Sequence, residues 1–290
     1  MTKRLCFSLI LLALSFTSLL RAQVSVELKL GRNNYLAGEA VPVQITVTNL
    51  SGQEILFQGT TQTAWIDFIV ESNRGVPLTP IAKPAFGAVR IPSGKAISRT
   101  LDLSEIYAID SLGNYSIYAI VRLPGQATSG FHSNRHLFTV NTAIPYWKQV
   151  VGVPGNSGRQ NEFRLIQYNN NRKNQLYAQI ADAKSGKILK THFLGDVLML
   201  RKPVVSVDSS LNMHVLYMMT PKFWGHARIA ADGKFLGRDL YQPAGGDPVL
   251  AKMKDGSIRT LGGELYDPKA AAEAQQRSRK ASDRPDFLYD

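Results

Sequence analysis

Three observations predict an all-β chain made of two antiparallel bodies. Apolar and polar residues alternate with a period of two from Val24 onward, as in "VSVELKL", which marks strands with one buried and one solvated face. Turn pairs such as Asp232-Gly233 and Asp255-Gly256 separate alternating segments and favour two-residue hairpin loops. Between residues 24 and 141 no helical period lasts longer than a turn.

Residues 1–22 have the layout of a secretory signal peptide. Basic residues precede an apolar run from Leu5 to Leu20, and the pattern turns polar after Ala22, where cleavage is expected. Leu20 stands where a small residue is preferred, so an N-terminal membrane anchor is the alternative, although the run is shorter than the ~20 residues of a spanning helix. No later segment is apolar enough to be transmembrane. We therefore expect an exported protein, either periplasmic or extracellular.

The position of the single cysteine excludes several kinds of chemistry from the mature chain. Cys6 is the only cysteine, and it lies within the apolar run of the signal segment. The exported chain would then have no disulfide, no thiolate nucleophile and no cysteine-based zinc or iron–sulfur site. Its stability must come from core burial, for which the remaining length is sufficient in two domains.

Residues 23–141 are predicted to form an Ig-like antiparallel sandwich. A core strand in "AVPVQITVTNL" places four aliphatic residues on one face. Further strand candidates are "EILFQG", "AWIDFIVES", "KAISRTLDL", "NYSIYAIVRL" and "RHLFTVN". Turn signals at Ser51-Gly52, Pro92-Ser93-Gly94 and Leu112-Gly113-Asn114 divide them. About seven short strands in this length are typical of a sandwich.

Residues 35–123 resemble the Ig-like modules of secreted bacterial proteins, and in particular the BsuPI-type proteinase-inhibitor-like module. The shared features are the Y-x-x-G-E turn of "YLAGE" before the core strand and the G-x-Y-x-x-x-A pattern within "LGNYSIYAIVRL". Glycine lets the chain reverse at low steric cost, and the Tyr115 hydroxyl can cap a sheet edge. The resemblance implies a sandwich fold and, as an activity, proteinase inhibition. Because the matching residues are framework and no reactive loop is identifiable, a spacer or docking role is favoured.

The C-terminal half is predicted to be a blade-like β-repeat domain spanning residues 163–267. Pro, Gly, Asn and Ser interrupt the alternation over residues 142–162, which we interpret as a linker. After it, "KPVVSVDSSLNMHVLY" aligns with "DPVLAKMKDGSIRTLG" at a period of 45, so that Pro203 falls on Pro248. "EFRLIQYN" stands at the position of "NMHVLYMM" one unit earlier. A period of about 40–50 residues with four strands is the spacing of propeller blades.

The form of these hairpins weakly resembles the blades of BNR/sialidase-like propellers, from which this chain departs at two points. The Asp-box pattern of those blades has glycine at the position of Ser210 and an aromatic residue near Met213. About two periods fit into the domain, whereas a closed propeller needs at least about four blades. We therefore expect an open, blade-like sheet or a small second sandwich. Unpaired strand edges would allow oligomerisation.

The positive charge of the protein is concentrated in its C-terminal half. Residues 142–290 carry 22 Lys and Arg against 14 Asp and Glu. A protein or an acidic glycan is a possible partner of such a surface, but the scattered charges favour simple solvation, and no specific nucleic-acid binding is expected. Residues 268–290 combine helix-forming and basic residues with almost no apolar face, which predicts a short helix and a flexible basic tail.

The chain offers no catalytic signature, and we predict no catalytic residue, cofactor or metal site. His132 and His136 are too far apart along a strand to share an ion, and His214 and His226 could lie diagonally across one hairpin without a carboxylate to join them. Histidines at the surface or at strand edges are favoured. Three aspartates are explained as turn residues: Asp208, Asp232 and Asp255.

Exposed aromatic side chains are the remaining candidates for ligand contact. Four could stack on a sugar, although core or linker packing is the more ordinary role: Tyr146, Trp147, Phe223 and Trp224. Two hypotheses follow. The first is an exported, non-enzymatic binding or scaffolding protein of the cell envelope or extracellular space. The second is a BsuPI-like proteinase inhibitor or a carbohydrate-binding protein related to BNR-type repeats.

Overall fold

The chain divides into two compact units, residues 1–142 and 143–290. The computed structural model describes residues 24–60, 64–84, 86–123, 130–156, 158–169, 173–267, 269–273 and 276. The expected signal peptide lies outside these residues, as does most of the basic tail. Within the described part of the chain, no helix has the length and apolar character needed to cross a bilayer.

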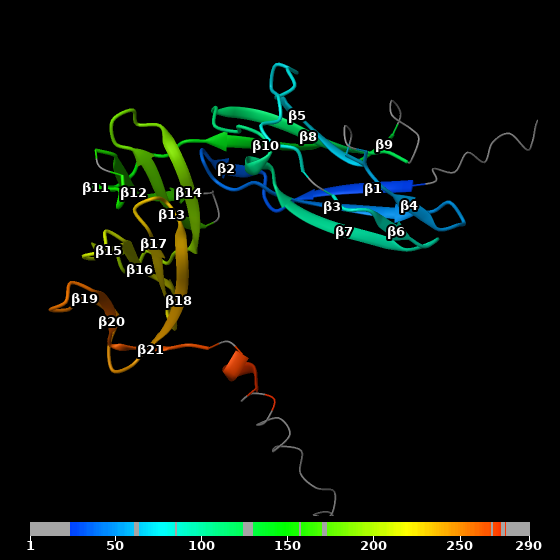
Figure 1. Ribbon diagram of the computed structural model, residues 1–290. Coiled ribbons are helices and arrows are strands. Elements are labelled where there is room, and N and C mark those ends of the chain that lie inside the picture. Colours follow the sequence, from blue (N-terminus) through cyan, green and yellow to red (C-terminus); the bar gives the residue numbers. More distant parts are fainter. Residues whose placement is uncertain are drawn as a thin grey trace, which may run out of the picture. The chain divides into compact units, whose positions relative to one another are not determined.

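The first unit is an Ig-like sandwich of two main sheets, which form the two layers seen in Figure 1. One sheet has the order β1-β3-β7, the other β2-β10-β8-β5 with β9 beside β8, and β4 pairs with β6. The elements are β1 (Val24–Leu30), β2 (Asn34–Leu36), β3 (Pro42–Asn49), β4 (Ile55–Phe57), β5 (Ile66–Ser72), β6 (Val89–Ile91), β7 (Ala96–Asp102), the 3-10 turn η1 (Leu103–Glu105), β8 (Gly113–Val121), β9 (Phe131–His132) and β10 (His136–Asn141). The expectation of purely antiparallel pairing fails at one place, because β2 runs parallel to β10.

The predicted alternation produces the core of the first unit. Val24, Val26 and Leu28 of β1 are buried while the residues between them are exposed. Near the start of β8, the hydroxyl of Tyr115 donates to the Ser111 carbonyl four residues upstream, at 2.7 Å. Its ring stacks on Phe138 of β10 with 5.3 Å between centroids. A tyrosine that closes a corner in this way is a hallmark of Ig-like sandwiches.

The Y-x-x-G-E turn forms a buried polar unit between β2 and β3. Gly38 has φ +78°, which a residue with a side chain adopts only under strain. This reversal turns Glu39 inward, where its carboxylate accepts the Leu36 N–H at 2.9 Å and pairs with Arg32. Tyr35 is buried beneath, and the Arg32 guanidinium lies 5.1 Å from the centre of its ring. The glutamate of the motif is therefore structural.

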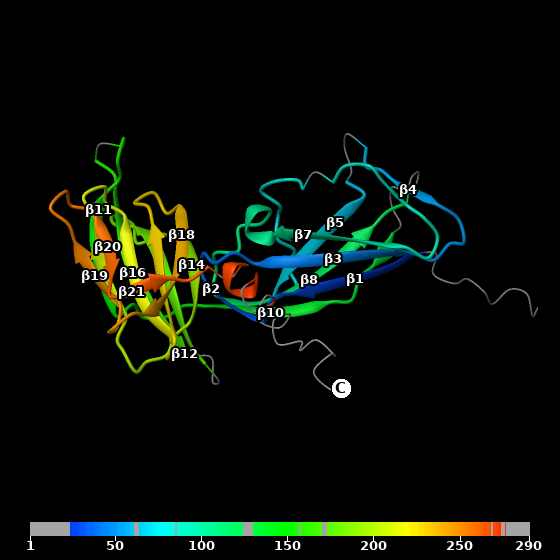
Figure 2. The ribbon, with the colours of Figure 1, turned by 90° about the horizontal axis from the view of Figure 1, so that it is seen from below.

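The second unit consists of consecutive antiparallel sheets in a propeller-like arrangement (Figure 1). The first sheet has the order β11-β12-β13-β14, the second β15-β16-β17-β18-β21, and β19 pairs with β20. The strands are β11 (Trp147–Gly152), β12 (Gln160–Asn169), β13 (Asn174–Asp182), β14 (Ile188–Asp196), β15 (Val204–Val207), β16 (Met213–Thr220), β17 (Phe223–Ile229), β18 (Phe235–Pro243), β19 (Val249–Lys252), β20 (Ile258–Leu261) and β21 (Gly263–Leu265). In Figure 2 the strands of this unit run side by side.

The stretch interpreted as a linker, residues 142–162, contains β11 and the start of β12. Trp147 to Gly152 pair in register with Leu165 to Gln160, so this segment is the first strand of a sheet. Apolar and polar residues do not alternate in this segment because β11 is an edge strand that is mostly exposed. The first two strands of the sheet thus begin before residue 163.

The 45-residue repeat is present in the structure. β15 and β19 both begin at the residue after the aligned prolines, and β16 and β20 begin 45 residues apart, at Met213 and Ile258. The hairpin turns contain the expected glycines, and Gly233 and Gly256 have φ values of +92° and +81°. Asp232 and Asp255 each accept a backbone N–H two residues on, at 2.9 Å, as turn aspartates do. The third repeat, however, has two strands where the earlier sheets have at least four.

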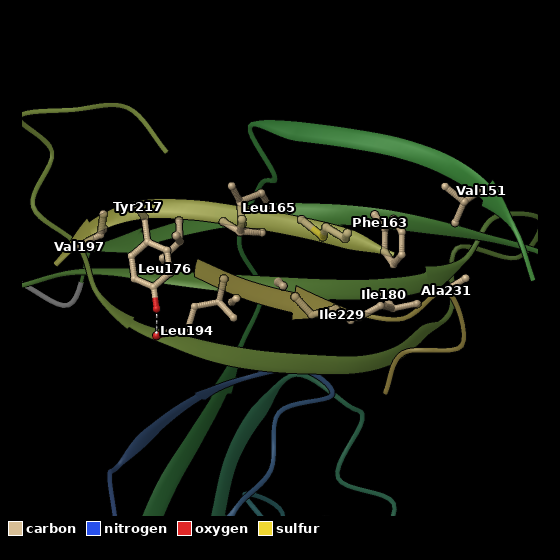
Figure 3. Close-up of a cluster of buried hydrophobic side chains, with 14 residues drawn as sticks. Val151, Phe163, Leu165, Leu176, Ile180, Leu194, Val197, Tyr217, Ile229 and Ala231 are labelled. Carbon is tan, nitrogen blue, oxygen red and sulfur yellow. Dashed lines mark hydrogen bonds between the residues drawn. The ribbon is translucent and has the colours of Figure 1, made fainter. Parts of the chain in front are cut away.

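A hydrophobic core fills the space between the first two sheets of the second unit. Figure 3 shows Phe163, Leu165 and Ile180 of the first sheet meeting Tyr217 and Ile229 of the second. The hydroxyl of Tyr217 donates a hydrogen bond to the Leu194 carbonyl, so the one polar group of this ring is satisfied. The two sheets therefore share a single core.

Replacement of Gly225 by alanine is expected to destabilise the second unit by about 1–3 kcal/mol. Gly225 lies opposite Tyr217 in the sheet, and an added Cβ would stand 2.7 Å from Cζ of that buried ring. Gly152 is the control, because an added Cβ there meets nothing within 4 Å and the backbone needs no positive φ. Chemical denaturation of the two variants should show a lower midpoint for Gly225→Ala only. Equal midpoints would contradict the overpacking argument.

Candidate functional site

The four predicted ligand-stacking aromatics do not form one platform. Trp224 is 3% exposed and packs with Leu216 and Met218, so its ring is unavailable to a ligand. Trp147 packs against the core between the sheets, and Phe223 meets the edge of the Tyr266 ring at 4.8 Å. Tyr146 retains 38% exposure, with Lys202 Nζ 6.0 Å from the centre of its ring. Of the four, only Tyr146 presents an accessible ring beside a cation.

Three of the five histidines have structural roles. His192 Nε2 lies 2.8 Å from the Gly233 carbonyl, and His136 Nε2 lies 2.7 Å from the Leu28 carbonyl. His132 stacks on Tyr118 at 5.8 Å. The other two are not at the surface as expected, because His214 and His226 are 5% and 3% exposed.

His214 and His226 belong to a hydrogen-bonded chain that crosses the second unit, which we call the histidine relay (Asp208, His214, His226 and Thr260). His214 Nδ1 lies 2.9 Å from His226 Nε2. The outer nitrogen of His214 contacts Asp208 Oδ2 at 3.2 Å, and that of His226 contacts Thr260 Oγ1 at 3.0 Å. Every ring nitrogen therefore has one partner.

The elements of the fold explain how these four groups meet. Strand β16 is buried on both faces: Met213, Val215 and Tyr217 face the first sheet. His214 alternates with them and faces the opposite way, toward the β19–β20 hairpin. His226 on β17 is its diagonal neighbour on the same face. The β15–β16 turn supplies Asp208, and β20 supplies Thr260.

Asp208 has a second role beyond the turn that was predicted for it. Its Oδ1 accepts the Asn212 N–H at 2.7 Å, which closes the turn, and its Oδ2 faces His214. Burial alone would raise the pKa of Asp208, but hydrogen bonds from Asn212 and His214 outweigh it and leave the pKa below its ordinary value. The expectation that no carboxylate joins the two histidines is therefore wrong. The sequence did contain a signal for this contact. Asp208 and His214 are six residues apart with a hairpin turn between them, and such a turn brings residues at that spacing next to each other.

While its four groups stay in contact, the histidine relay can accept one added proton but not a second. With both rings neutral, the Thr260 hydroxyl donates to His226, His226 Nε2–H donates to His214, and His214 Nε2–H donates to ionised Asp208. With one added proton on His214, the His214–His226 and His226–Thr260 bonds reverse direction without movement of heavy atoms, while His214 Nε2–H still donates to Asp208. Burial, followed by the charges of His214 and Arg228, lowers the pKa of His226 to about 4. Among the described residues, no group of three or more His, Cys, Asp or Glu is arranged to hold a metal ion.

Residues 76–84 of the first unit, "VPLTPIAKP", which we call the strap, carry exposed apolar side chains. Ile81 and Val76 are 66% and 58% exposed. The strap is nevertheless pinned to the sandwich: the Leu78 N–H donates to Val70 at 2.8 Å, and the Ile81 N–H donates to Ile106 at 2.7 Å. Pro80 forms a β-bridge with Tyr107. An anchored backbone thus holds exposed apolar side chains in fixed positions.

Two cavities adjoin the strap, and Ala82, Lys83 and Pro84 line both. The first, of about 190 Å³, has apolar walls that include Phe68 and a rim where Arg122 pairs with Asp67 at 3.3 Å. The second, of about 450 Å³, is lined by charged side chains as well as by the apolar Phe86, namely Lys83, Arg99, Asp102 and Glu105. Residues 82–84, at the end of the strap, are therefore a shared wall of the two cavities.

Comparisons with known proteins identify no family for this chain. No protein-family model matches it, and no curated protein matches its sequence. Among solved structures it is similar to the sporulation control protein Spo0M from Bacillus subtilis, with a TM-score of 0.29 and 8% identity, over 88% of this chain and 95% of that chain. A likeness of this size carries no argument about function. The sheet order of the chain itself shows an all-β fold with a propeller-like arrangement of sheets.

Proposed function

We propose that the protein is an exported, non-enzymatic binding or scaffolding protein and that the strap is its main contact surface. The supporting observation is an anchored backbone that exposes Ile81 and Val76 and that lines two cavities with the neighbouring residues 82–84. Three prolines in nine residues, Pro77, Pro80 and Pro84, restrict φ and reduce the conformational entropy lost on binding. Export is inferred from the signal-like residues 1–22.

The partner that fits this surface is another protein. Exposed apolar side chains that are surrounded by mixed charges are typical of protein–protein contact sites. The two cavities beside the strap are lined by charged residues of both signs, namely Lys83, Arg99, Arg122, Asp67, Asp102 and Glu105. Charges of both signs would fix the alignment of the partner and select against wrong partners, and they would add little net attraction.

Replacement of Ile81 by aspartate is expected to weaken binding to the envelope fraction of the source cells by at least about tenfold, the loss that removal of a central apolar anchor produces. Leu112→Asp is the matched control, because Leu112 is 58% exposed on another loop of the same unit. Saturable binding of labelled protein, measured with both variants, tests the proposal. Equal binding by Ile81→Asp and the wild type would exclude the strap.

Proteinase inhibition is the second candidate function, and the strap favours it as well. An inhibitory loop must be exposed and held by the scaffold, and residues 76–84 meet both requirements. Lys83 is followed by Pro84, which leaves Ile81 the better group for a proteinase specificity pocket. A panel of serine and metalloproteinases, assayed with micromolar protein, distinguishes the two functions. Inhibition that is lost in Ile81→Asp would establish the second.

Carbohydrate binding has a narrower basis. Tyr146 is exposed beside Lys202, which would suit an acidic sugar. The BNR-like resemblance adds the sheet type but no matching Asp-box. Glycan-array binding that depends on Tyr146 would support this function.

A further inference from the structure

The histidine relay joins the incomplete third repeat to the second sheet. Asp208, His214 and His226 belong to the second sheet and its turn, whereas Thr260 belongs to the β19–β20 hairpin. Other contacts also join the hairpin to that sheet. Leu250 packs against the cluster of Leu216 and Trp224. The Ser209 N–H donates to the Gly256 carbonyl at 3.0 Å, and the Ser209 hydroxyl donates to the Asp255 carbonyl at 3.5 Å. The relay is thus one of the polar links in a small contact.

We propose that the relay is an acid-operated latch, which keeps the β19–β20 hairpin on the second sheet while the two histidines share at most one proton and releases it when both are protonated. Two protonated rings would place an N–H of His214 against an N–H of His226 at a separation of 2.9 Å. Each ring would carry a positive charge, with 5.1 Å between centroids and little exposure to water. The hairpin is the movable partner because it has two strands, whereas the sheet on which it packs has five.

The other charged and titratable groups around the pair come from β17 and β18. Arg228 of β17 lies opposite His214 in the sheet, and its charge opposes protonation. Asp239 of β18 lies opposite His226, and its carboxylate is paired with Arg228 at 2.9 Å. Tyr241 of β18 lies 6.3 Å from His226 between ring centroids. On β15, Ser206 lies opposite His214 and carries no charge.

The hairpin itself brings no acidic side chain to the relay. Lys252 lies on the same face of the hairpin as Thr260, exposed at the end of β19, and Arg259 points from the other face. The Asp255 carboxylate accepts a hydrogen bond from the Ser257 hydroxyl within its own turn. Asp208 is thus the carboxylate that contacts a ring nitrogen of the two histidines, whereas Asp239 is paired with Arg228. Asp208 can balance one added proton but not two.

The direction of the pH effect follows from the closed and open states. The closed hairpin keeps His226 neutral down to a pKa of about 4, and opening restores the ordinary value near 6.5. Opening therefore takes up a proton between these values, so a falling pH favours the open state. From pH 7 to pH 4.5 the opening equilibrium should increase roughly 50-fold.

Hydrogen exchange of the purified protein tests the latch. After correction for intrinsic rates, protection of the β19–β20 amides should fall roughly 50-fold between pH 7 and pH 4.5, while β12 and β13 remain protected. His226→Gln, which cannot take up the proton, should abolish this step. His192→Gln is the matched control, because His192 is a partly buried histidine outside the relay, and this variant should retain the step. An unchanged hairpin in the wild type, or an unchanged step in His226→Gln, would overturn the proposal.

Imidazole nitrogen shifts of the wild-type protein give a second readout that needs no variant. One ring of the pair should stay neutral from pH 7 to pH 4.5 for as long as the hairpin amides are protected. Two fully protonated rings in a protein whose hairpin is still protected would refute the latch.

Discussion

Replacement of Glu39 by alanine should lower the free energy of unfolding of the first unit by about 3 kcal/mol, because it leaves a buried arginine contact and a backbone N–H without their acceptor. The Glu39 side chain is 2% exposed, whereas Arg32 retains 28% exposure and regains some hydration in the variant. The Leu36 N–H is buried in β2, so water cannot replace the lost acceptor. Burial raises the pKa of Glu39 even with Arg32 beside it, which shows how little water reaches the carboxylate.

Glu39→Gln is the matched control for this prediction. Its side-chain oxygen still accepts the Leu36 N–H but carries no charge for Arg32, so a loss of about 1–2 kcal/mol is expected. Denaturant unfolding with hydrogen exchange in β2 and β3 reports on the first unit within the whole protein. If Glu39→Ala and Glu39→Gln lose the same amount, the N–H contact contributes nothing and the role assigned to the Y-x-x-G-E turn is wrong.

Local patterns in the sequence were sufficient to predict most of the fold. Alternation such as that of Val24, Val26 and Leu28 specifies a strand together with its buried face. Asp-Gly pairs specify hairpins because few residues adopt a positive φ. The aligned prolines at 203 and 248 revealed a repeat whose strands begin 45 residues apart in the structure. Each of these signals is contained in a few neighbouring residues.

Features that depend on distant partners were not predictable in the same way. β11 is a strand because β12 lies beside it, and its own residues, mostly exposed at an edge, show no alternation. The parallel pairing of β2 with β10 joins segments about 100 residues apart and has no local signature.

The histidine relay illustrates the same limit within the candidate site. A strand whose two faces are both covered gives no alternation to distinguish a core histidine from a surface one. His214 and His226 are buried because the β19–β20 hairpin covers the second face of β16 and β17. Only the folded arrangement places the hydroxyl of Thr260, 34 residues further along the chain, against His226.

Replacement of Phe163 by alanine should cost about 3–5 kcal/mol and should destabilise both main sheets of the second unit together. Phe163 belongs to β12 but is fully buried against residues of β16 and β17, so the cavity lies between the sheets and belongs to neither alone. Hydrogen exchange at increasing denaturant should therefore show β13 and β16 losing protection at the same midpoint, in the wild type and, at a lower midpoint, in the variant.

Phe193→Ala in β14 is the control for this prediction, because Phe193 is 39% exposed and its removal should cost about 1 kcal/mol. Unfolding of β12 and β13 in Phe163→Ala while β16 and β17 stay protected would mean that each sheet is stable alone, as in a repeat array whose interfaces are weak. A shared transition would mean that the first two sheets form one cooperative body. The β19–β20 hairpin would then be the part of the second unit that can open without unfolding the rest, because it lies outside the core that contains Phe163.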